Sequence, residues 1–445
     1  MGKEGVLTKA DEKIRDEFTR LKEFYRLKEE EWNSAQDQQK RNKIHADMNW
    51  AYKRKETIKR KQLIDFLASH AVIPKYGFPV DVVELDILSH QDAAKNIQLE
   101  RDLSIAISEF APGSQVVANG YIWESEGLKV VRNRTWPIYW YAICSECNKF
   151  FIKSGTIEEN PPSFSCDVHG PISRGDIHRF VTPIFGFVTS KDFEPKKPGE
   201  SRPKHEFTTR PYFFSYEKPE ERTFNIGGFK IKCKYSSDGE LAVICKGKKG
   251  GFWICFDCGA AFPERKRKHK TPYGMDCTSP LKGPFHLGHT FKTDVLSISF
   301  EEPNINESYI REIFRSKSIK INNKFVESFW LSLLYAVLEG ASQALGIKRE
   351  DLNGCLHSSE GRIMLILFDN VPGGAGHVKR IMSERNLYEV LKGALARVKN
   401  CACGLETSCY GCLRSYENQF CHDLLKRGVV WEFLERNLEG DQLRR

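Results

Sequence analysis

Residues 363–376 run Ile-Met-Leu-Ile-Leu-Phe-Asp-Asn-Val-Pro-Gly-Gly-Ala-Gly, an apolar stretch followed by a glycine-rich turn. Six consecutive apolar residues are typical of a strand that is buried on both faces. A strongly apolar helix is predicted just before this stretch, over 325–344, and another after it, over about 387–399. Together with a last helix around 429–438, these elements predict an α/β domain at 306–445.

Before this domain, the composition and the expected secondary structure of the chain change twice. The first 70 residues are rich in charge, contain no proline and carry apolar residues at helical spacing, which predicts long helices. Short β-rich runs follow, interrupted by prolines. We therefore expect an α+β multidomain protein with a helical docking segment at 1–70, a β-rich region with a zinc knuckle at 71–190, a Pro-rich linker or strap at 191–222, a second β-rich zinc region at 223–305 and the C-terminal α/β domain at 306–445.

Composition narrows the class of protein. The 445 residues are 40% hydrophobic and 29% charged, with a net charge of +9 and 14 cysteines. No apolar run is long enough to span a membrane, and the start of the sequence has neither a signal core nor a myristoylation site. We expect a cytoplasmic protein, where stable disulfides are rare, so the cysteines need another explanation.

The first cysteine group is Cys144-Ser-Glu-Cys147, followed by Cys166-Asp-Val-His169. Two ligands separated by two residues can hold one zinc ion from a single turn, and a second pair completes a tetrahedron. The spacing predicts a structural zinc site, with accidental buried thiols as the alternative.

The second group is Cys255-Phe-Asp-Cys258, followed by Gly259, whose freedom to adopt positive φ suits a zinc knuckle. Cys277 is the expected third ligand, although it could be an ordinary core thiol. We choose His269 as the fourth ligand. His286 and His289 are its rivals.

The third group places Cys401, Cys403, Cys409 and Cys412 within twelve residues. Four uncoordinated thiols so close together would be prone to oxidation, which favours a metal. Zinc is expected, with an iron–sulfur cluster as the alternative. About three zinc sites result, and all look coordinatively full, which favours structural over catalytic metal.

Two basic runs, residues 53–61 and 265–270, are candidates for contact with nucleic-acid phosphates. A solvated surface is the alternative at both runs. Arg414 and its neighbours Tyr416, Asn418 and His422 could contact a nucleotide, or they could lock the zinc loop onto its domain. The cationic candidates are Lys53, Arg54, Lys55, Lys59, Arg60, Lys61, Arg265, Lys266, Arg267, Lys268, Lys270 and Arg414.

The glycine turn at 372–376 resembles an anion-binding loop, but the P-loop pattern Gly-x-x-x-x-Gly-Lys-Ser/Thr is absent from the sequence. Either packing or a nucleic-acid backbone contact would explain the glycines. Asp369 and His377 flank the turn, and an acid–base pair is conceivable there. A capping role for both residues is the simpler interpretation.

Two stretches carry a family resemblance. Leu-Phe-Asp-Asn-Val-Pro-Gly-Gly-Ala-Gly-His at 367–377 and Ser-Cys-Tyr-Gly-Cys-Leu-Arg-Ser-Tyr-Glu-Asn-Gln-Phe at 408–420, with Cys401 and Cys403, resemble the signature of the MrfA-type zinc-binding (MZB) domain. That domain ends many DEAD/DEAH-box helicases and occurs in the DrmB subunit of the DISARM antiphage system. Residues 66–80 are more loosely similar to the segment that follows the motor in such helicases, and His286-Leu-Gly-His289 with Thr293-Asp294 resembles their middle part.

The resemblance implies that Cys401, Cys403, Cys409 and Cys412 are the zinc ligands of an MZB domain. It does not carry over ATP hydrolysis, because the sequence has no P-loop. We therefore expect a non-catalytic accessory subunit that binds DNA and a separately encoded RecA-fold helicase or ATPase, in antiphage defence and away from membranes. The alternatives are a metal-dependent nuclease or phosphoryl-transfer enzyme using Asp369 and His377, and a zinc scaffold that binds only protein.

Overall fold

A computed structural model describes residues 81–438 except for 90–93, 95–96, 132–133, 159, 200–206, 249, 315–321 and 360, and before them residues 22, 25–34, 37, 41, 44–45 and 48. The chain divides into two compact units, Met1–Asp81 and Val82–Arg445. Nearly all described residues of the first unit are helical, as predicted. The basic run at 53–61, with its six candidate phosphate ligands, lies outside the described residues.

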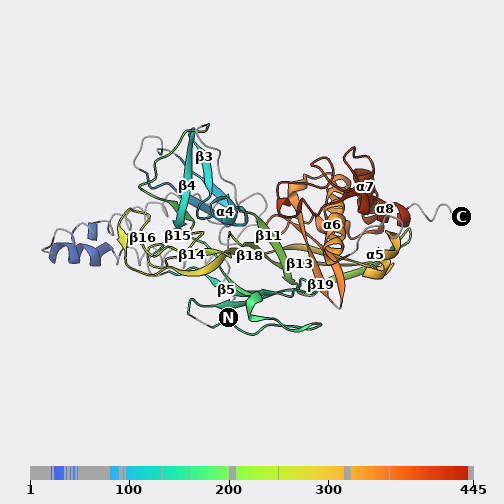
Figure 1. The fold of residues 1–445 in the computed structure, drawn as a ribbon, viewed down its shortest axis with the longest axis horizontal. Coiled ribbons are helices and arrows are strands. Elements are labelled where there is room, and N and C mark those ends of the chain that lie inside the picture. Colours follow the sequence, from blue (N-terminus) through green and yellow to red (C-terminus); the bar gives the residue numbers. More distant parts are fainter. Residues whose placement is uncertain are drawn as a thin grey trace, which may run out of the picture. The chain divides into compact units, whose positions relative to one another are not determined.

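Two long antiparallel strands, β13 (Phe229–Cys245) and β18 (Lys282–Glu302), run through the second unit (Figure 1). Their pairing extends from Lys230 opposite Glu302 to Cys245 opposite Leu287. The first half of β18 also pairs with β9 (Ile177–Val181) and β14 (Phe252–Ile254), and its second half with β20 (Arg362–Asp369). One strand therefore joins the predicted zinc regions to the C-terminal domain.

The large sheet built on these strands crosses the boundaries expected at 190, 222 and 305, because it contains strands from every expected segment after residue 71. Its order is β11 (Thr209–Ser215), β13, β18, β9, β5 (Ile138–Ile143) and β6 (Phe150–Gly155), with β12 (Glu220–Ile226) on β13, β15 (Ala261–Phe262) on β14, and β19 (Leu352–Ser359) on β20. A second sheet has the order β2 (Glu100–Asp102), β1 (Val82–Asp86), β10 (Phe187–Thr189), β4 (Tyr121–Leu128) and β3 (Gln115–Ala118), with helix α4 (Leu103–Glu109) directly after β2.

The expectation of a Pro-rich linker or strap at 191–222 is wrong for two parts of this segment, which form strands of the large sheet. β11 and most of β12 lie within it and pair with β13. Pro211 sits in β11 opposite Val243, and β11 ends the strand order of the sheet. An edge strand tolerates proline, because the missing N–H can face away from the ladder. Pro219 lies between the two strands, where a turn accepts it.

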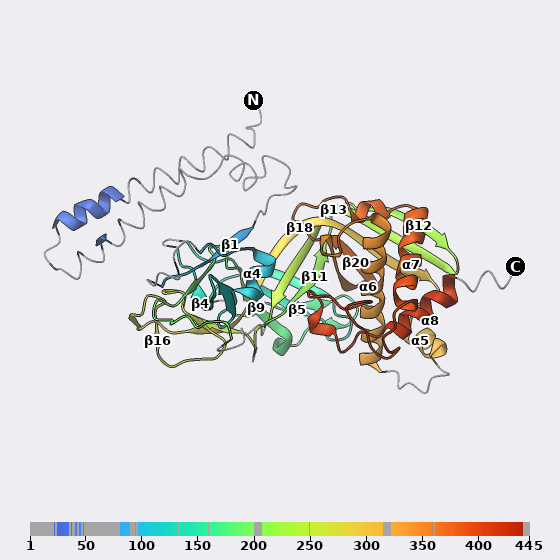
Figure 2. The ribbon, with the colours of Figure 1, turned by 90° about the horizontal axis from the view of Figure 1, so that it is seen from above.

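The C-terminal domain packs helices on this sheet. Helices α6 (Asn323–Leu345), α7 (Glu384–Lys399) and α8 (Arg427–Leu438) cover β12, β13, β18 and β20 (Figure 2), and α5 (Glu307–Ile313) follows β18. The strand predicted at 363–368 is β20, which is buried between β18 and β19. Among the described residues, no helix is long and apolar enough to cross a membrane.

Local sequence explains where α6 begins and ends. The Asn322 side chain accepts a hydrogen bond from the backbone N–H of Phe325 at 3.0 Å, and Gly346 ends the helix with φ +64°. Gly340 lets α6 approach α7 closely, since a Cβ there would overlap the carbonyl oxygen of Val390. Gly393 faces it from α7.

Candidate metal centres

The structure brings together all three predicted cysteine groups. In each group, the four candidate ligand atoms lie within 4.8 Å of one another. The first centre is Cys144, Cys147, Cys166 and His169; the second is Cys255, Cys258, His269 and Cys277; the third is Cys401, Cys403, Cys409 and Cys412.

The first centre joins two hairpins. Cys144 and Cys147 lie in the turn between β5 and β6, where the Asn148 N–H donates to the Cys144 carbonyl oxygen at 2.8 Å. Cys166 and His169 lie at the hairpin of β7 (Ser165–Cys166) and β8 (Gly170–Pro171). The Sγ atoms of Cys147 and Cys166 are 3.7 Å apart, and His169 Nδ1 lies 3.5 Å from Cys144 Sγ and 3.6 Å from Cys166 Sγ.

These separations fit one tetrahedral zinc ion. Zn–S bonds of about 2.3 Å and Zn–N bonds of about 2.0–2.1 Å place two sulfurs about 3.8 Å apart, and a sulfur and a nitrogen about 3.6 Å apart. Three thiols and one imidazole are a usual structural zinc set. His169 would use Nδ1, and its side chain is exposed.

The second centre closes around the turn that Gly259 allows. Gly259 has φ +83°, and its N–H donates to the Cys255 carbonyl oxygen at 2.9 Å. A hairpin of β16 (His269–Lys270) and β17 (Asp276–Cys277) supplies the other two ligands, with His269 directly opposite Cys277. Cys255 and Cys277 Sγ are 3.9 Å apart, and His269 Nε2 lies 3.4 Å from Cys258 Sγ.

The rival histidines lie outside this centre. His286 Nδ1 is 2.6 Å from the Tyr141 hydroxyl, and its Nε2 is 3.1 Å from the Gly250 carbonyl oxygen. His289 stacks on Phe291 with ring centroids 5.7 Å apart. His269, the histidine chosen from the sequence, is the one that the fold brings to the three thiols.

The third centre follows the end of α7 and packs against the main hydrophobic core. Its sulfurs are 3.5 Å apart for Cys401 and Cys403 and for Cys401 and Cys409, and 3.7 Å apart for Cys403 and Cys412. A multi-iron cluster would distribute the four thiolates over several irons, whereas this spacing suits a single ion. The geometry therefore favours zinc over the iron–sulfur alternative.

Arg427, at the start of α8, ties the third centre to the domain, a role that sequence reasoning missed. It is 7% exposed, and it donates from Nε to the Cys403 carbonyl oxygen and from Nη1 to the Val398 carbonyl oxygen, both at 2.8 Å. A buried cation joined to two carbonyls holds the zinc loop against the end of α7. In the sequence, Arg427 differs in no visible way from surface arginines.

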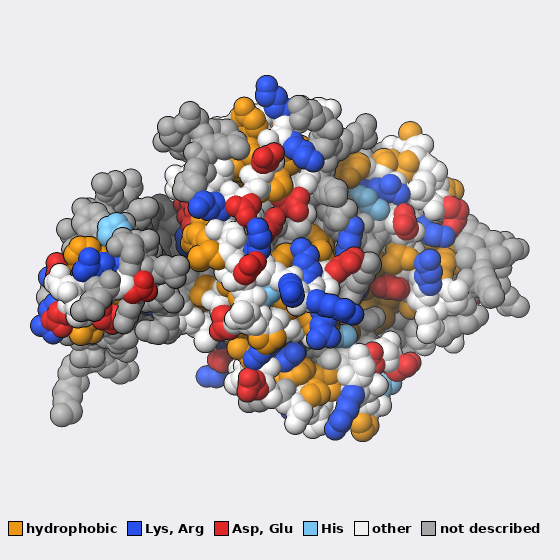
Figure 3. Space-filling model, turned by 60° about the vertical axis from the view of Figure 1, so that its left-hand side comes forward, with side chains coloured by type: hydrophobic (Ala, Val, Ile, Leu, Met, Phe, Trp, Pro, Cys, Tyr) orange, Lys and Arg blue, Asp and Glu red, His pale blue; other side chains and the backbone are white. Residues whose placement is uncertain are grey.

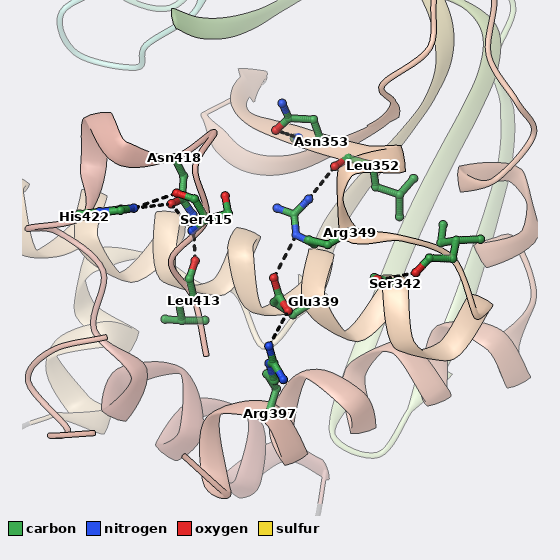
Figure 4. A network of polar contacts seen from close by, with 12 residues as sticks. Glu339, Ser342, Arg349, Leu352, Asn353, Arg397, Leu413, Ser415, Asn418 and His422 are labelled. Carbon is green, nitrogen blue, oxygen red and sulfur yellow. Dashed lines mark hydrogen bonds and ion pairs between the residues drawn. The ribbon is translucent and has the colours of Figure 1, made fainter. Parts of the chain in front are cut away.

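The residues after Cys412 support the locking role rather than a nucleotide contact. Asn418 is fully buried; its Nδ2 donates to the Leu413 carbonyl oxygen, and its Oδ1 lies 2.9 Å from His422 Nε2 (Figure 4). Arg414 is half-buried and donates from Nε to the Ser408 hydroxyl at 3.1 Å. Tyr416 remains 65% exposed. Contact between Arg414 and DNA stays a prediction. The Arg414 guanidinium already forms a hydrogen bond within its own loop, to Ser408.

The glycine turn at 372–376 holds two carboxylates of the protein itself. Asp369 accepts from the backbone N–H groups of Ala375 at 2.6 Å, His377 at 2.9 Å and Val378 at 3.0 Å. Asp294 of β18 accepts from the Gly376 N–H at 2.8 Å and from the Tyr235 hydroxyl at 2.6 Å. These donors are therefore engaged internally, which supports packing over a phosphate contact.

Asp369 is fully buried, and burial raises the pKa of its carboxyl group, against the lowering effect of the three N–H groups. Its partner in the turn is the backbone of His377, not the imidazole. After His377 the chain forms a short 3-10 turn, Val378–Ile381. This geometry gives no support to an acid–base pair.

The basic loop between ligands of the second centre is exposed. Arg265, Lys266, Arg267 and Lys268 are all exposed, and among the described residues none of the four forms an ion pair. The Arg265 guanidinium lies over the Trp253 ring at 5.0 Å, and Lys266 Nζ lies 3.7 Å from the Phe262 ring centroid. Lys270 pairs with Asp192 at 3.7 Å.

The four cysteines outside the centres are buried, as expected of core thiols. Burial raises the pKa of each thiol to about 12, so all four remain protonated at neutral pH. They are Cys233, Cys245, Cys355 and Cys421.

Three comparisons relate the chain to known proteins. Over 432 residues it is 26% identical to the Druantia protein DruE of Escherichia coli (strain UMEA 4076-1), and the match covers 86% of this chain and 22% of that protein. The chain thus spans about a fifth of the length of this relative. A solved structure, the DUF1998 helicase MrfA bound to DNA, resembles it with a TM-score of 0.34 and 12% identity, over 79% of this chain and 34% of that one.

The family comparison falls on the third centre. Residues 333–413 match the family model of the MrfA Zn-binding domain, and this range includes most of α6, all of α7 and the four cysteines. The chain therefore contains an MrfA Zn-binding domain.

Proposed function

We propose that the chain is a zinc-stabilised, non-motor part of a DNA-processing defence machine, which binds DNA and works with a RecA-fold ATPase on a separate chain. The MrfA Zn-binding domain and the three metal centres support the zinc-stabilised scaffold. The similarity to a Druantia protein supports a role in antiphage defence. That relative gives no support to the DISARM assignment, which stays a prediction.

The observation that carries DNA binding is the loop Arg265–Lys268. Its four cations are exposed and outside any ion pair among the described residues, and Cys258 and His269, candidate ligands of one metal centre, lie before and after it in the chain. A loop clamped at both ends loses little entropy on binding, and neutralising phosphates releases counterions. Elsewhere, cations stand among carboxylates on the face shown in Figure 3, so the +9 charge forms no single basic surface there.

The partner ATPase is proposed because the sequence has no P-loop. The nuclease alternative has the weaker support, since Asp369 is buried and its oxygens accept three backbone N–H groups. The other alternative, a scaffold that binds only protein, would be favoured if the DNA-binding test were negative.

The test is fluorescence anisotropy of zinc-loaded full-length protein with labelled DNA over a series of salt concentrations. We expect the logarithm of affinity to fall linearly with the logarithm of salt, and Arg267→Glu with Lys268→Glu to weaken binding at least tenfold and flatten the slope by about two units. Lys230→Glu with Arg436→Glu is the control, because both cations already pair with carboxylates. Absence of DNA binding by the wild-type protein at low salt would leave the protein-only scaffold.

A further inference from the structure

The hairpin β16–β17, which directly follows the basic loop Arg265–Lys268 in the chain, presents two exposed apolar side chains. Tyr273 is 58% exposed and Met275 is 64% exposed, and both lie in the turn Thr271–Met275. Two large side chains exposed side by side at one hairpin tip leave apolar area in contact with water, which makes the tip a candidate contact surface.

The turn that carries them is held rigidly. The Thr271 N–H donates to the Met275 carbonyl oxygen at 2.7 Å, and the Gly274 N–H donates to the Thr271 carbonyl oxygen at 2.9 Å. The candidate ligands His269 and Cys277 face each other at the base of the hairpin. The metal would therefore fix the hairpin at its base.

A neighbouring segment fixes the tip as well. The Lys191 N–H donates to the Pro272 carbonyl oxygen at 2.8 Å, and Lys270 pairs with Asp192 at 3.7 Å. Gly274 has φ +84°, and a Cβ there would lie 2.7 Å from Asp192 Oδ2. Tyr273 and Met275 are thus presented by a preorganised turn, which reduces the entropy lost on binding.

The charge around the tip selects the kind of ligand. Between residues 264 and 277, five lysines and arginines stand against two carboxylates, Glu264 and Asp276. From other segments, Asp192 pairs with Lys270, and Asp86 and Lys129 interact with Tyr273, so the excess of positive charge comes from the loop Arg265–Lys268. A tip that binds only an apolar protein surface would not require the four exposed cations of the preceding loop, none of which forms an ion pair among the described residues. An aromatic ring and a flexible thioether beside such cations match a strand whose phosphates meet the cations while its bases stack.

We propose that Tyr273 and Met275 form a stacking site for unpaired nucleobases, next to the phosphate-binding loop Arg265–Lys268. This inference rests on the proposed DNA-binding function and adds the class of ligand, a single strand or the unpaired end of a duplex. Paired bases inside a duplex hide their faces, so only the loop would contact duplex DNA. Partial burial raises the pKa of the Tyr273 hydroxyl, which keeps the phenol neutral beside phosphates.

The experiment compares the zinc-loaded full chain on two fluorescein-labelled probes of about 20 nucleotides, an oligothymidylate and a blunt duplex. Tyr273→Ala with Met275→Ala should weaken oligothymidylate binding about tenfold or more, since a stacked base contributes about 1–3 kcal/mol, and should change duplex binding less than about twofold. Tyr273→Trp should retain the binding. Tyr388→Ala, at another exposed tyrosine, is the matched control.

The outcomes separate this inference from the proposed function. If Arg267→Glu with Lys268→Glu weakens both probes while Tyr273→Ala with Met275→Ala changes neither, the stacking site is overturned and DNA binding stands. Equal losses on both probes for the Tyr273 and Met275 variant would also overturn the preference for unpaired bases. If the wild-type protein binds neither probe at low salt, the proposed function and this inference fail together. Zinc content of each variant shows that the hairpin remains folded.

Discussion

Asp369 Oδ2 accepts a hydrogen bond from the backbone N–H of His377 at 2.9 Å, across the glycine turn that separates the two residues. This contact shows how the turn is built. The carboxylate takes the position that a bound anion would occupy at an unfilled loop of N–H groups. The turn therefore joins β20 to α7 by an internal cap, and its glycines serve close packing, as at Gly374, where a Cβ would overlap the Asp294 carboxylate.

We expect Asp369→Ala to lower the free energy of unfolding by about 2–3 kcal/mol, because the buried N–H of Val378 and the half-buried N–H groups of Ala375 and His377 would lose their acceptor, and a buried donor without a partner costs about 1–3 kcal/mol. Urea denaturation followed by circular dichroism measures the change. Asp423→Ala, at an exposed carboxylate of the same domain, should stay within about 0.5 kcal/mol of wild type. An Asp369→Ala protein as stable as wild type would contradict the capping role.

Local spacing made the metal centres predictable. Four Cys-x-Cys or Cys-x-x-Cys pairs and the pair Cys166-x-x-His169 each place two ligands within one turn, which accounts for ten of the twelve residues that the fold brings together. His269 and Cys277 complete the second centre from a hairpin. His269, which was chosen over His286 and His289, lies between Cys258 and Cys277 in the sequence. The buried strand at 363–368 was predictable for the same reason, since a continuous apolar run depends on no distant partner.

Contacts between distant segments were not predictable. Asp294 reaches Gly376 across 82 positions, and nothing near either residue indicates the other. Pro211 misled the interpretation of 191–222, because proline density predicts a linker unless the strand is known to lie at an edge. The register of β13 on β18, which merges the expected domains into one sheet, likewise depends on pairing that a single sequence does not reveal.

Metal analysis should find three zinc ions per chain, one for each centre. We expect Cys412→Ser to remove one of the three and to destabilise the C-terminal domain strongly, because the third centre packs against its core. Cys144→Ser should also remove one zinc ion, with a smaller loss of stability, because its partner His169 is exposed, the hairpin β5–β6 lies at the end of the large sheet and β7–β8 forms a separate two-stranded sheet.

Cys421→Ser provides the matched control for this experiment. Cys421 is 2% exposed and lies outside every centre, so its serine variant should keep three zinc ions even if packing suffers. Loss of zinc from Cys421→Ser, or three zinc ions in Cys412→Ser, would contradict the assignment of ligands.

The free energy of unfolding should fall as the pH is lowered, in part because His286 is buried in its neutral form. Its Nε2–H donates to the Gly250 carbonyl oxygen, so Nδ1 accepts from the Tyr141 hydroxyl; the tautomer follows from these partners. Burial, with His178 and Lys246 nearby, lowers the pKa of His286 to about 3. The unfolded chain binds this proton near pH 6.5, so the stabilisation is present above that pH and is lost as pH falls toward 3.

We therefore expect the gap in unfolding free energy between wild type and His286→Gln to narrow between pH 6.5 and pH 5, because glutamine cannot titrate. Urea denaturation at several pH values measures it, and zinc content followed in parallel identifies any loss caused by protonation of metal ligands. A gap that stays constant over this range would contradict a neutral, buried His286.

The close approach of α6 and α7 at Gly340 should tolerate no side chain. In Gly340→Ala the new methyl group would overlap the Val390 carbonyl oxygen, and a backbone atom inside a helix cannot move aside as a side chain can. We expect the free energy of unfolding to fall by about 1–3 kcal/mol or more, despite the higher helix propensity of alanine. Gly175→Ala is the matched control, because a Cβ there meets only Ser173 Oγ, at 3.8 Å. Thermal unfolding of both variants measures the difference. If Gly340→Ala and Gly175→Ala have equal melting temperatures, α6 and α7 can move apart without loss of stability, and the close packing at Gly340 is contradicted.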